Sequence, residues 1–197
     1  MEEENLQLES YMALCPLDGR YLDISKQLSP YFSEYVLTKN RVKVEVLWLK
    51  FLIENIKDSD ILNSIKEKDI SKILKIYEDF SEESYLRIRQ IDKITNHDVK
   101  AAEIYVGEEL KKIGFDKLVS FVHIGCTSED INNTSYGNMI KNGLNDVWIK
   151  SAESLIDVIS KLAKDNSNIP MLAHTHGQPA TPTTVGKEFK VYEYRLK

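Results

Sequence analysis

The sequence has few of the residues that form disulfides, metal sites or breaks between helices. Its 197 residues include two cysteines, five prolines and eight glycines. Cys15 and Cys126 are far apart and in neither a CxxC pair nor another metal-type spacing. We interpret them as free thiols in a reducing compartment, with packing rather than nucleophilic roles.

Long apolar runs and an excess of positive charge are also missing. No apolar stretch reaches the roughly 18 residues that a membrane span needs, and the acidic start, MEEENLQ, does not resemble a signal peptide. The net charge of -5 and the pI near 5.5 argue against nucleic-acid or membrane-surface binding, since both need a basic face. We therefore expect a cytoplasmic protein with no nucleic-acid partner and no membrane partner.

Between the few glycines and prolines, the sequence has helical periodicity and almost no strict strand alternation. Val36, Val44, Leu47 and Phe51 predict the buried face of a helix over residues 33–54. Further helices are predicted over residues 61–77, 81–94 and 99–113. The chain is therefore predicted to be all-α, beginning with a compact helical domain over residues 1–126.

The remaining residues, 127–197, have the pattern of a long-helix bundle. One apolar seam steps alternately by four and three through Trp148, Ala152, Leu155, Ile159 and Leu162, which is typical of a helix that packs along long neighbours. Another helix is predicted to begin with Thr181 as N-cap and Pro182 at its first position. Its apolar stripe reaches Lys197 with too few partners, so we expect the front part of a longer protein, in which further helices or self-association cover the seam.

Four short motifs have residues suited to binding or catalysis. In LCPLDGRY, residues 14–21, a turn presents Arg20 and Tyr21, and the guanidinium suits a phosphate or a carboxylate. A simple N-terminal turn with a solvated arginine is the alternative.

In the second motif, TNHDVKAAE, residues 95–103, Asn96, His97 and Asp98 precede a helix whose N-terminus can attract an anion. Asp98 is predicted to cap this helix, and a purely structural His97 remains open.

The third motif, FVHIGCTSEDINN, spans residues 121–133. Thr127 and Asp130 fit a capping box, which places Ser128 at the mouth of a helix. Such a mouth can hold a phosphate or a carboxylate, with His123 nearby. Acidic residues that complement the helix dipole are the alternative explanation of Glu129 and Asp130.

The fourth motif, AHTHGQPATPTT, spans residues 173–184 and contains His174 and His176. A zinc site needs a third ligand that the neighbours do not supply, and no nucleophile elbow is present. An unperturbed imidazole has a pKa of about 6.5, so it can both hold and release a proton at neutral pH. General acid–base chemistry is therefore the remaining hypothesis.

Taken in order, the four motifs closely resemble those of the adenylosuccinate lyases, in particular the bacterial-type branch within the fumarase and aspartase superfamily. The resemblance extends from about Leu14 to Lys197. It implies a lyase of purine nucleotide biosynthesis that eliminates fumarate from adenylosuccinate and from succinyl-aminoimidazole carboxamide ribotide. It also implies a homotetramer in the full-length protein, a nucleotide as substrate, and neither cofactor nor metal.

The resemblance also assigns roles to residues. His176 is implied to be the general acid, and His97 and His123 to orient the substrate and hold its anionic groups. His174 is given no role. The remaining expected substrate-binding residues are Arg20, Tyr21, Asn96, Asp98, Thr127, Ser128 and Gln178.

One element of the family is missing from this sequence. The catalytic base is implied to be a serine in an SSxMPxKxN loop, and no such run occurs among the 197 residues. We therefore expect the chain alone to be inactive. Another lyase of the superfamily, such as an argininosuccinate lyase, and a noncatalytic helical interaction module remain as alternatives.

Overall fold

The computed structural model describes residues 13–197. The chain divides into two units, one up to Gly143 and the other from Leu144 to Lys197. Helices dominate both, and the two strands described form one small sheet. The all-α class is therefore confirmed, with a hairpin added. The predicted boundary between residues 126 and 127 falls at the start of a helix rather than between the two units, and it stays a prediction.

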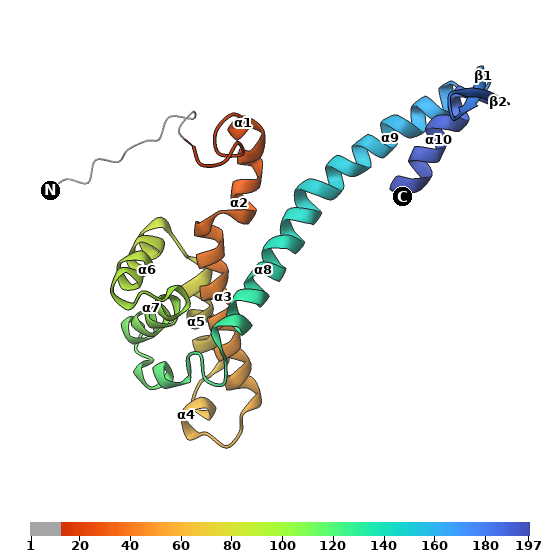
Figure 1. Cartoon of the computed structure of the whole chain (residues 1–197). Coiled ribbons are helices and arrows are strands. Elements are labelled where there is room, and N and C mark those ends of the chain that lie inside the picture. The colour runs from red at the N-terminus through yellow and green to blue at the C-terminus, as the bar shows by residue number, and fades with distance from the viewer. Residues whose placement is uncertain (1–12) are drawn as a thin grey trace. The chain divides into compact units, whose positions relative to one another are not determined.

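The first unit is a group of helices around the long helix α3, which contacts α5, α7 and α8, while α6 and α7 lie side by side (Figure 1). Its elements are α1 (Leu22–Ser25), η2 (Lys26–Leu28), α2 (Ser29–Phe32), α3 (Glu34–Asn55), α4 (Asp60–Asn63), α5 (Glu67–Glu78), α6 (Glu82–Thr95), α7 (Asp98–Lys112), η3 (Asp116–Phe121) and α8 (Ser128–Gly143). The core lies where α3, α5, α6 and α7 meet.

The predicted buried face of α3 is wrong. Leu47 and Phe51 are exposed, whereas Val42, Val46 and Leu49 are fully buried. Apolar residues occur on nearly every side of this helix, so periodicity could not select the inner face. Tertiary packing buries the side that also contains the charged residues Arg41 and Glu45.

Local capping explains where several of these helices begin and end. Ser33 accepts a hydrogen bond from the Val36 amide at the start of α3. At the end of α7, Gly114 has a φ of 84°, and the amides of Gly114 and Phe115 donate to the carbonyls of Lys111 and Leu110. This is a Schellman motif, and it confirms Gly114 as the residue that terminates the predicted helix.

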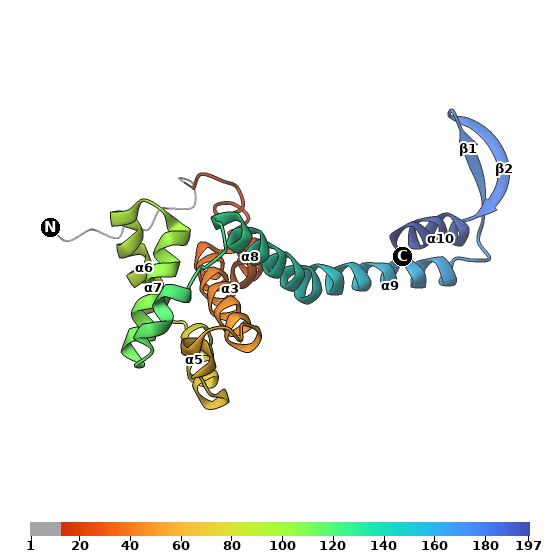
Figure 2. The ribbon, with the colours of Figure 1, turned by 90° about the horizontal axis from the view of Figure 1, so that it is seen from below.

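The second unit contains two helices and a β-hairpin (Figure 2). A π-helical turn, η4 (Leu144–Trp148), leads into α9 (Ile149–Asp165). The strands β1 (Pro170–Thr175) and β2 (Gln178–Thr184) pair antiparallel, and α10 (Val185–Leu196) follows them. The helices α9 and α10 pack against each other.

The predicted start of the last helix is wrong by three residues. Thr181 and Pro182 belong to β2, and the cap is Thr184, whose Oγ1 accepts from the Lys187 amide over 3.1 Å. Proline is tolerated in β2 because a strand with a single neighbour has a free side. The hairpin gave no alternating signal because nearly all its side chains are exposed.

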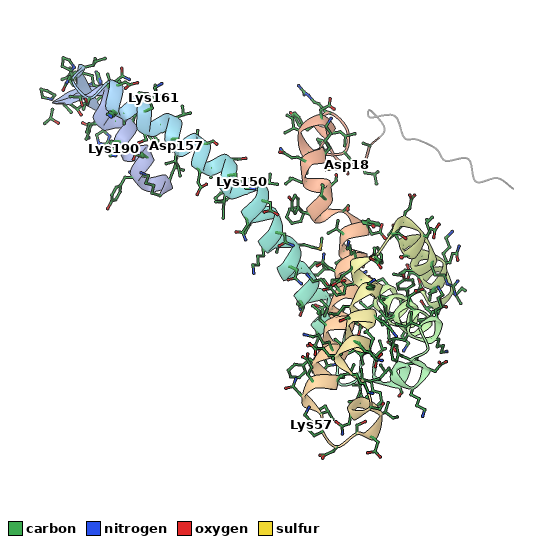
Figure 3. All side chains as sticks on the ribbon, turned by 180° about the vertical axis from the view of Figure 1, so that it is seen from behind. Asp18, Lys57, Lys150, Asp157, Lys161 and Lys190 are labelled. Atoms are coloured by element: carbon green, nitrogen blue, oxygen red, sulfur yellow. The ribbon has the colours of Figure 1, made fainter. Side chains whose placement is uncertain are left out.

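The apolar seam of α9 is open within the second unit. Trp148 and Leu155 are 63% and 53% exposed, and Ala163 is the only buried residue of α9. Charged residues such as Lys150, Asp157 and Lys161 lie along the same helix (Figure 3). Across residues 13–197, no helix combines the length and the apolar character required to cross a bilayer.

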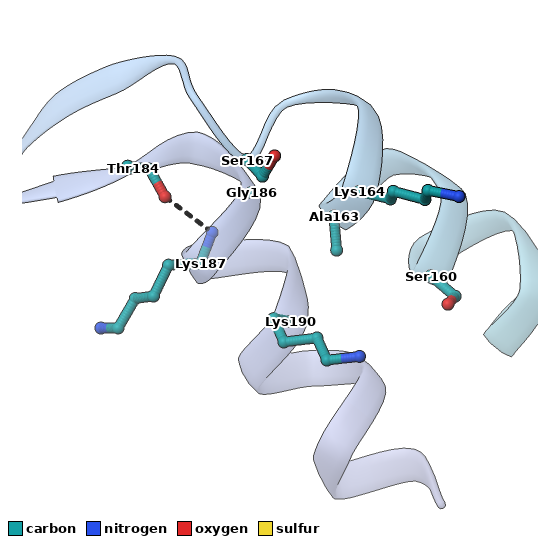
Figure 4. Close-up of a pocket in the computed structure, with 8 residues that line it drawn as sticks. All are labelled: Ser160, Ala163, Lys164, Ser167, Thr184, Gly186, Lys187 and Lys190. Carbon is teal, nitrogen blue, oxygen red and sulfur yellow. Dashed lines mark hydrogen bonds between the residues drawn. The ribbon is translucent and has the colours of Figure 1, made fainter.

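The inner side of α10 contains a buried acid. Glu193 is 2% exposed and accepts hydrogen bonds from Lys190 and Lys197 over 2.8–2.9 Å. Lys190 and Lys187 also line a pocket between α9 and α10 (Figure 4). The two lysine ammonium groups lower the pKa of Glu193 to about 2.

We expect Glu193→Gln to destabilise the protein at pH 7 and to have no effect near pH 2. A carboxylate whose pKa is lower in the folded chain adds stability above its ordinary value of 4.5, and this contribution is lost as the pH falls towards 2. Urea denaturation followed by circular dichroism at both pH values measures the difference. The same change at exposed Glu153 is the control, and an equal loss for Glu193→Gln at both pH values would contradict the prediction.

Candidate functional site

His97 stands at the mouth of α7 and caps it, in place of the predicted Asp98. Its Nδ1 accepts a hydrogen bond from the Lys100 amide over 3.1 Å. A backbone N–H can only donate, so the proton of the neutral imidazole must be on Nε2. Asp98 occupies the first helical position, where its carboxylate accepts from the Val99 amide. The two side chains are 50% and 53% exposed, so the start of α7 faces the solvent.

The mouth of α8 lies against this histidine. Ser128 begins α8, and its hydroxyl is 3.4 Å from Nε2 of His97, which can donate to it. Asp130 accepts a hydrogen bond from the Thr127 amide over 2.8 Å, the carboxylate half of the predicted capping box. Two helix N-termini, predicted separately from the sequence, therefore share one side-chain contact.

Arg41, on α3, contacts residues near the starts of both α7 and α8. Its side chain is 7% exposed, its Nη2 lies 2.5 Å from Asp98, and its Nε donates to Asn132 of α8 over 2.9 Å. A buried guanidinium needs such partners, because an unpaired buried charge is strongly destabilising. Arg41 thereby fixes the start of α7 relative to α8.

His123 lies in the turn before α8 and contacts a second buried charge of α3. Its Nδ1 is 2.6 Å from Oε1 of Glu45, a residue with no exposed surface. The indole of Trp48 donates to the carbonyl of Ile124 over 2.9 Å and so fastens the same turn to α3. Burial raises the pKa of the Cys126 thiol, with a smaller contribution from the charge of Glu45. This agrees with a packing role for that cysteine.

Three predicted site residues have unusual backbones. Asn96, His123 and His176 have φ of 48°, 62° and 52°, and in residues 13–197 they are the only residues other than glycine with positive φ. Such conformations persist where the surrounding structure enforces them, and they are concentrated at functional sites. Their coincidence with the motifs favours a functional role over that of plain loop residues.

His176 lies at the tip of the hairpin in the second unit. Thr175 pairs with Gln178, so His176 and Gly177 form a two-residue loop. Both have positive φ, as a type I′ turn requires. His174 lies in β1 and pairs with Pro179 of β2. The hairpin therefore presents the imidazole of His176 on an exposed turn.

Arg20 and Tyr21 follow a hydrogen-bonded turn over residues 15–19. The Arg20 guanidinium lies 5.5 Å from the centre of the Tyr21 ring, a cation–π contact, and both side chains are exposed. Within the described part of the chain, no hydrogen bond, ion pair or ring contact joins them to His97 or Ser128. The structure therefore brings together His97, Asp98 and Ser128, and it leaves Arg20 and Tyr21 separate from them.

Arg41 and Glu45 lie outside the four sequence motifs and were not predicted as site residues. They are four residues apart on α3, which places them on the same face of the helix one turn apart. Arg41 supports the two helix mouths, and Glu45 supports the turn that contains His123. Their signal in the sequence was two opposite charges at an i, i+4 spacing, which normally indicates a surface ion pair.

This arrangement suits the binding of anions and the transfer of protons. Two helix N-termini provide positive potential, although side chains already bind some of their amides, and the Ser128 hydroxyl and the His97 imidazole meet between them. In residues 13–197, no three His, Cys, Asp or Glu side chains gather as a metal ion would require.

Comparison with protein families identifies the class. The family described as "Lyase" matches residues 19–197. This match covers most of the chain, including every motif except the first residues of LCPLDGRY. The chain therefore belongs to this lyase family.

Individual relatives are adenylosuccinate lyases. The enzyme of Dictyostelium discoideum is 43% identical, and those of Escherichia coli (strain K12) and Haemophilus influenzae are 42% and 41% identical. Each alignment covers 98% of this chain and 42% of the relative. The resemblance predicted from the motifs is confirmed, and the chain spans about 42% of the length of these curated relatives.

Solved structures agree on the fold. A fumarate lyase from Mesorhizobium sp. BNC1 matches with a TM-score of 0.67 at 22% identity, over 87% of this chain and 37% of the other. A 3-carboxy-cis,cis-muconate lactonizing enzyme from Pseudomonas putida matches with a TM-score of 0.59 at 16% identity, over the same shares. At these identities the likeness concerns the fold alone.

Proposed function

We propose that this chain supplies part of the active site of an adenylosuccinate lyase. The enzyme would release fumarate from adenylosuccinate, leaving AMP, and from succinyl-aminoimidazole carboxamide ribotide, in the cytoplasm. The contact between His97 and Ser128 at two helix mouths carries the proposal. It is supported by the identity of 41–43% with adenylosuccinate lyases over 98% of the chain.

The reaction is a β-elimination. A base removes a proton from the succinyl group, hydrogen-bond donors hold the resulting carbanion, and an acid protonates the departing nitrogen. His176 is the proposed acid. An exposed imidazole at a rigid two-residue turn can receive a proton from water and deliver it to a bound substrate.

The substrate has a phosphate and two carboxylates, whereas the chain has a net charge of -5. Binding therefore needs local positive potential. The mouths of α7 and α8 supply it, with Thr127 and Ser128 as hydroxyl donors and with Asn96 and Asp98 near the nucleotide. The guanidinium of Arg20, with Tyr21 beside it, is the proposed phosphate contact, and Gln178 adds an amide beside His176.

The catalytic base is proposed to be the serine of an SSxMPxKxN loop, a run that does not occur in this sequence. The working enzyme is proposed to be a homotetramer. The exposed seam of α9, which includes Trp148 and Leu155, supports assembly because a large apolar surface of this kind normally packs against partners. The 197-residue chain alone should therefore release no fumarate.

A chimera tests the function. It consists of residues 1–197 followed by the part of the Escherichia coli relative that lies beyond its matched region. We expect the chimera to release fumarate from adenylosuccinate, while the chain alone does not. Argininosuccinate is the comparison substrate, and turnover of it in place of adenylosuccinate would contradict the proposal. A chimera that forms tetramers by gel filtration yet turns over neither substrate would support the noncatalytic alternative.

A further inference from the structure

Glu45 is a buried acid to which nothing above assigns a function. It lies in the middle of α3 with no exposed surface, and Oε1 contacts Nδ1 of His123. Its other oxygen, Oε2, is also buried and has no hydrogen-bond partner among residues 13–197. A buried acid with one unpaired oxygen is destabilising. Its retention in a packed helix therefore calls for a reason other than stability.

We infer that Glu45 is a positioning residue, which holds a proton on Nδ1 of His123 and so leaves Nε2 as the ring atom that meets the substrate. The inference deepens the proposed function and rests on it only for the identity of that substrate. Within the described part of the chain, Nε2 has no hydrogen-bond partner, and the side chain of His123 is 19% exposed. The ring is thus fixed at one nitrogen and open at the other.

The position of the proton follows from relative basicity. An imidazole ordinarily binds a proton about two pH units more tightly than a carboxyl group. Burial, the largest effect, raises the pKa of Glu45, while the hydrogen bond and the charge of His123 oppose the rise and Glu103 adds to it. We place the shared proton on the imidazole because it is ordinarily the more basic of the two groups and its Nδ1 lies 2.6 Å from Oε1, within reach of a charge-assisted bond to the carboxylate.

The backbone supports the same geometry. His123 has a φ of 62°, which few residues other than glycine adopt, and the bond from Trp48 to Ile124 holds the turn in place. The two histidines of the first unit then have opposite arrangements. His97 accepts at Nδ1 and has its proton on Nε2, whereas His123 donates at Nδ1. The site would thus present two imidazoles with different hydrogen-bonding capacities.

Nitrogen-15 NMR of the ring nitrogens in the ligand-free 197-residue chain tests the inference. At about pH 9 a free imidazole is neutral and its two nitrogens give well-separated signals. We expect the proton of His123 on Nδ1 and that of His97 on Nε2 in one spectrum. A His123 ring with its proton on Nε2 alone would overturn the inference.

Two variants isolate the carboxylate. Glu45→Met removes every hydrogen-bonding atom at similar volume, and replacement of a buried charge in this way often leaves a fold intact. Glu45→Gln retains the shape and removes the charge. In Glu45→Met we expect Nε2-protonated His123 to appear, whereas the amide oxygen of Glu45→Gln can still accept from Nδ1 and should retain part of the Nδ1-protonated form. The His97 signals should be unchanged in both variants. Glu193→Gln, which alters a buried glutamate distant in the sequence, should leave the His123 signals as they are.

An unchanged proton position in Glu45→Met would refute the role of Glu45. Circular dichroism of each variant shows that it is folded, so a lost signal is not mistaken for a moved proton. The NMR result is also independent of turnover. If the chimera were inactive while Glu45 still controlled the His123 proton, the proposed function would fall and the positioning role would stand.

Discussion

Replacing His176 by asparagine is expected to lower fumarate release by the chimera about 10²- to 10⁴-fold, the range for loss of a general acid or base. Asparagine suits this experiment because Asn-Gly is the dipeptide that type I′ turns favour most. The turn of His176 and Gly177 should therefore fold at least as well. The loss then reports on chemistry rather than on folding.

The neighbouring histidine provides a matched control. His174 lies in β1 of the same hairpin, two residues before His176. His174→Thr removes an imidazole at a strand position that threonine suits, so we expect kcat within a few-fold of the starting chimera. An equal loss in both variants would show that hairpin stability, and not proton donation at position 176, limits the rate.

Local signals allowed much of the fold to be predicted. Helix starts such as Thr127 and helix ends such as Gly114 depend on hydrogen bonds within a few residues, so a short stretch of sequence specifies them. The capping residue of α7 was misassigned by one position, because histidine is a rarer cap than the aspartate that follows it. Nδ1 of His97 nevertheless performs the same task as a carboxylate.

Tertiary features could not be read from the sequence in this way. The inner face of α3 contains Arg41 and Glu45, and these two charges have partners only because Asp98, Asn132 and His123 reach them from distant segments. The hairpin was missed because its exposed strands lack alternation. The candidate histidines were thus predictable by motif, whereas the residues that orient them required the packed helices.

The second large effect concerns a glycine at the start of α10. A Cβ added to Gly186 would lie 2.3 Å from the carbonyl oxygen of Ala163 and 2.6 Å from the backbone of Ser167. These are backbone atoms of α9 and of the turn that follows it (Figure 4), so no rotamer change can relieve the contact. Overpacking typically costs about 1–3 kcal/mol. We expect Gly186→Ala to lower the free energy of unfolding by about 3 kcal/mol or more, because backbone atoms cannot move aside.

The same substitution elsewhere should have the opposite sign. Gly137 lies within α8, and an added Cβ there has no neighbour within 4 Å. Gly137→Ala should stabilise the protein by about 1 kcal/mol, since alanine favours a helix more than glycine does. Urea denaturation measures both changes. Destabilisation by Gly137→Ala, or none by Gly186→Ala, would contradict the packing argument.

Hydrogen exchange can locate the effect within the second unit. The amides of Val185 and Gly186 donate to the carbonyls of Ile169 and Asn166, so α10 is tied to the two ends of the loop between α9 and β1. Forcing α10 away from α9 should break both bonds and expose these amides, while those of α7 remain protected. Because these bonds also anchor the base of the hairpin, Gly186→Ala in the chimera should reduce fumarate release without altering His176 itself.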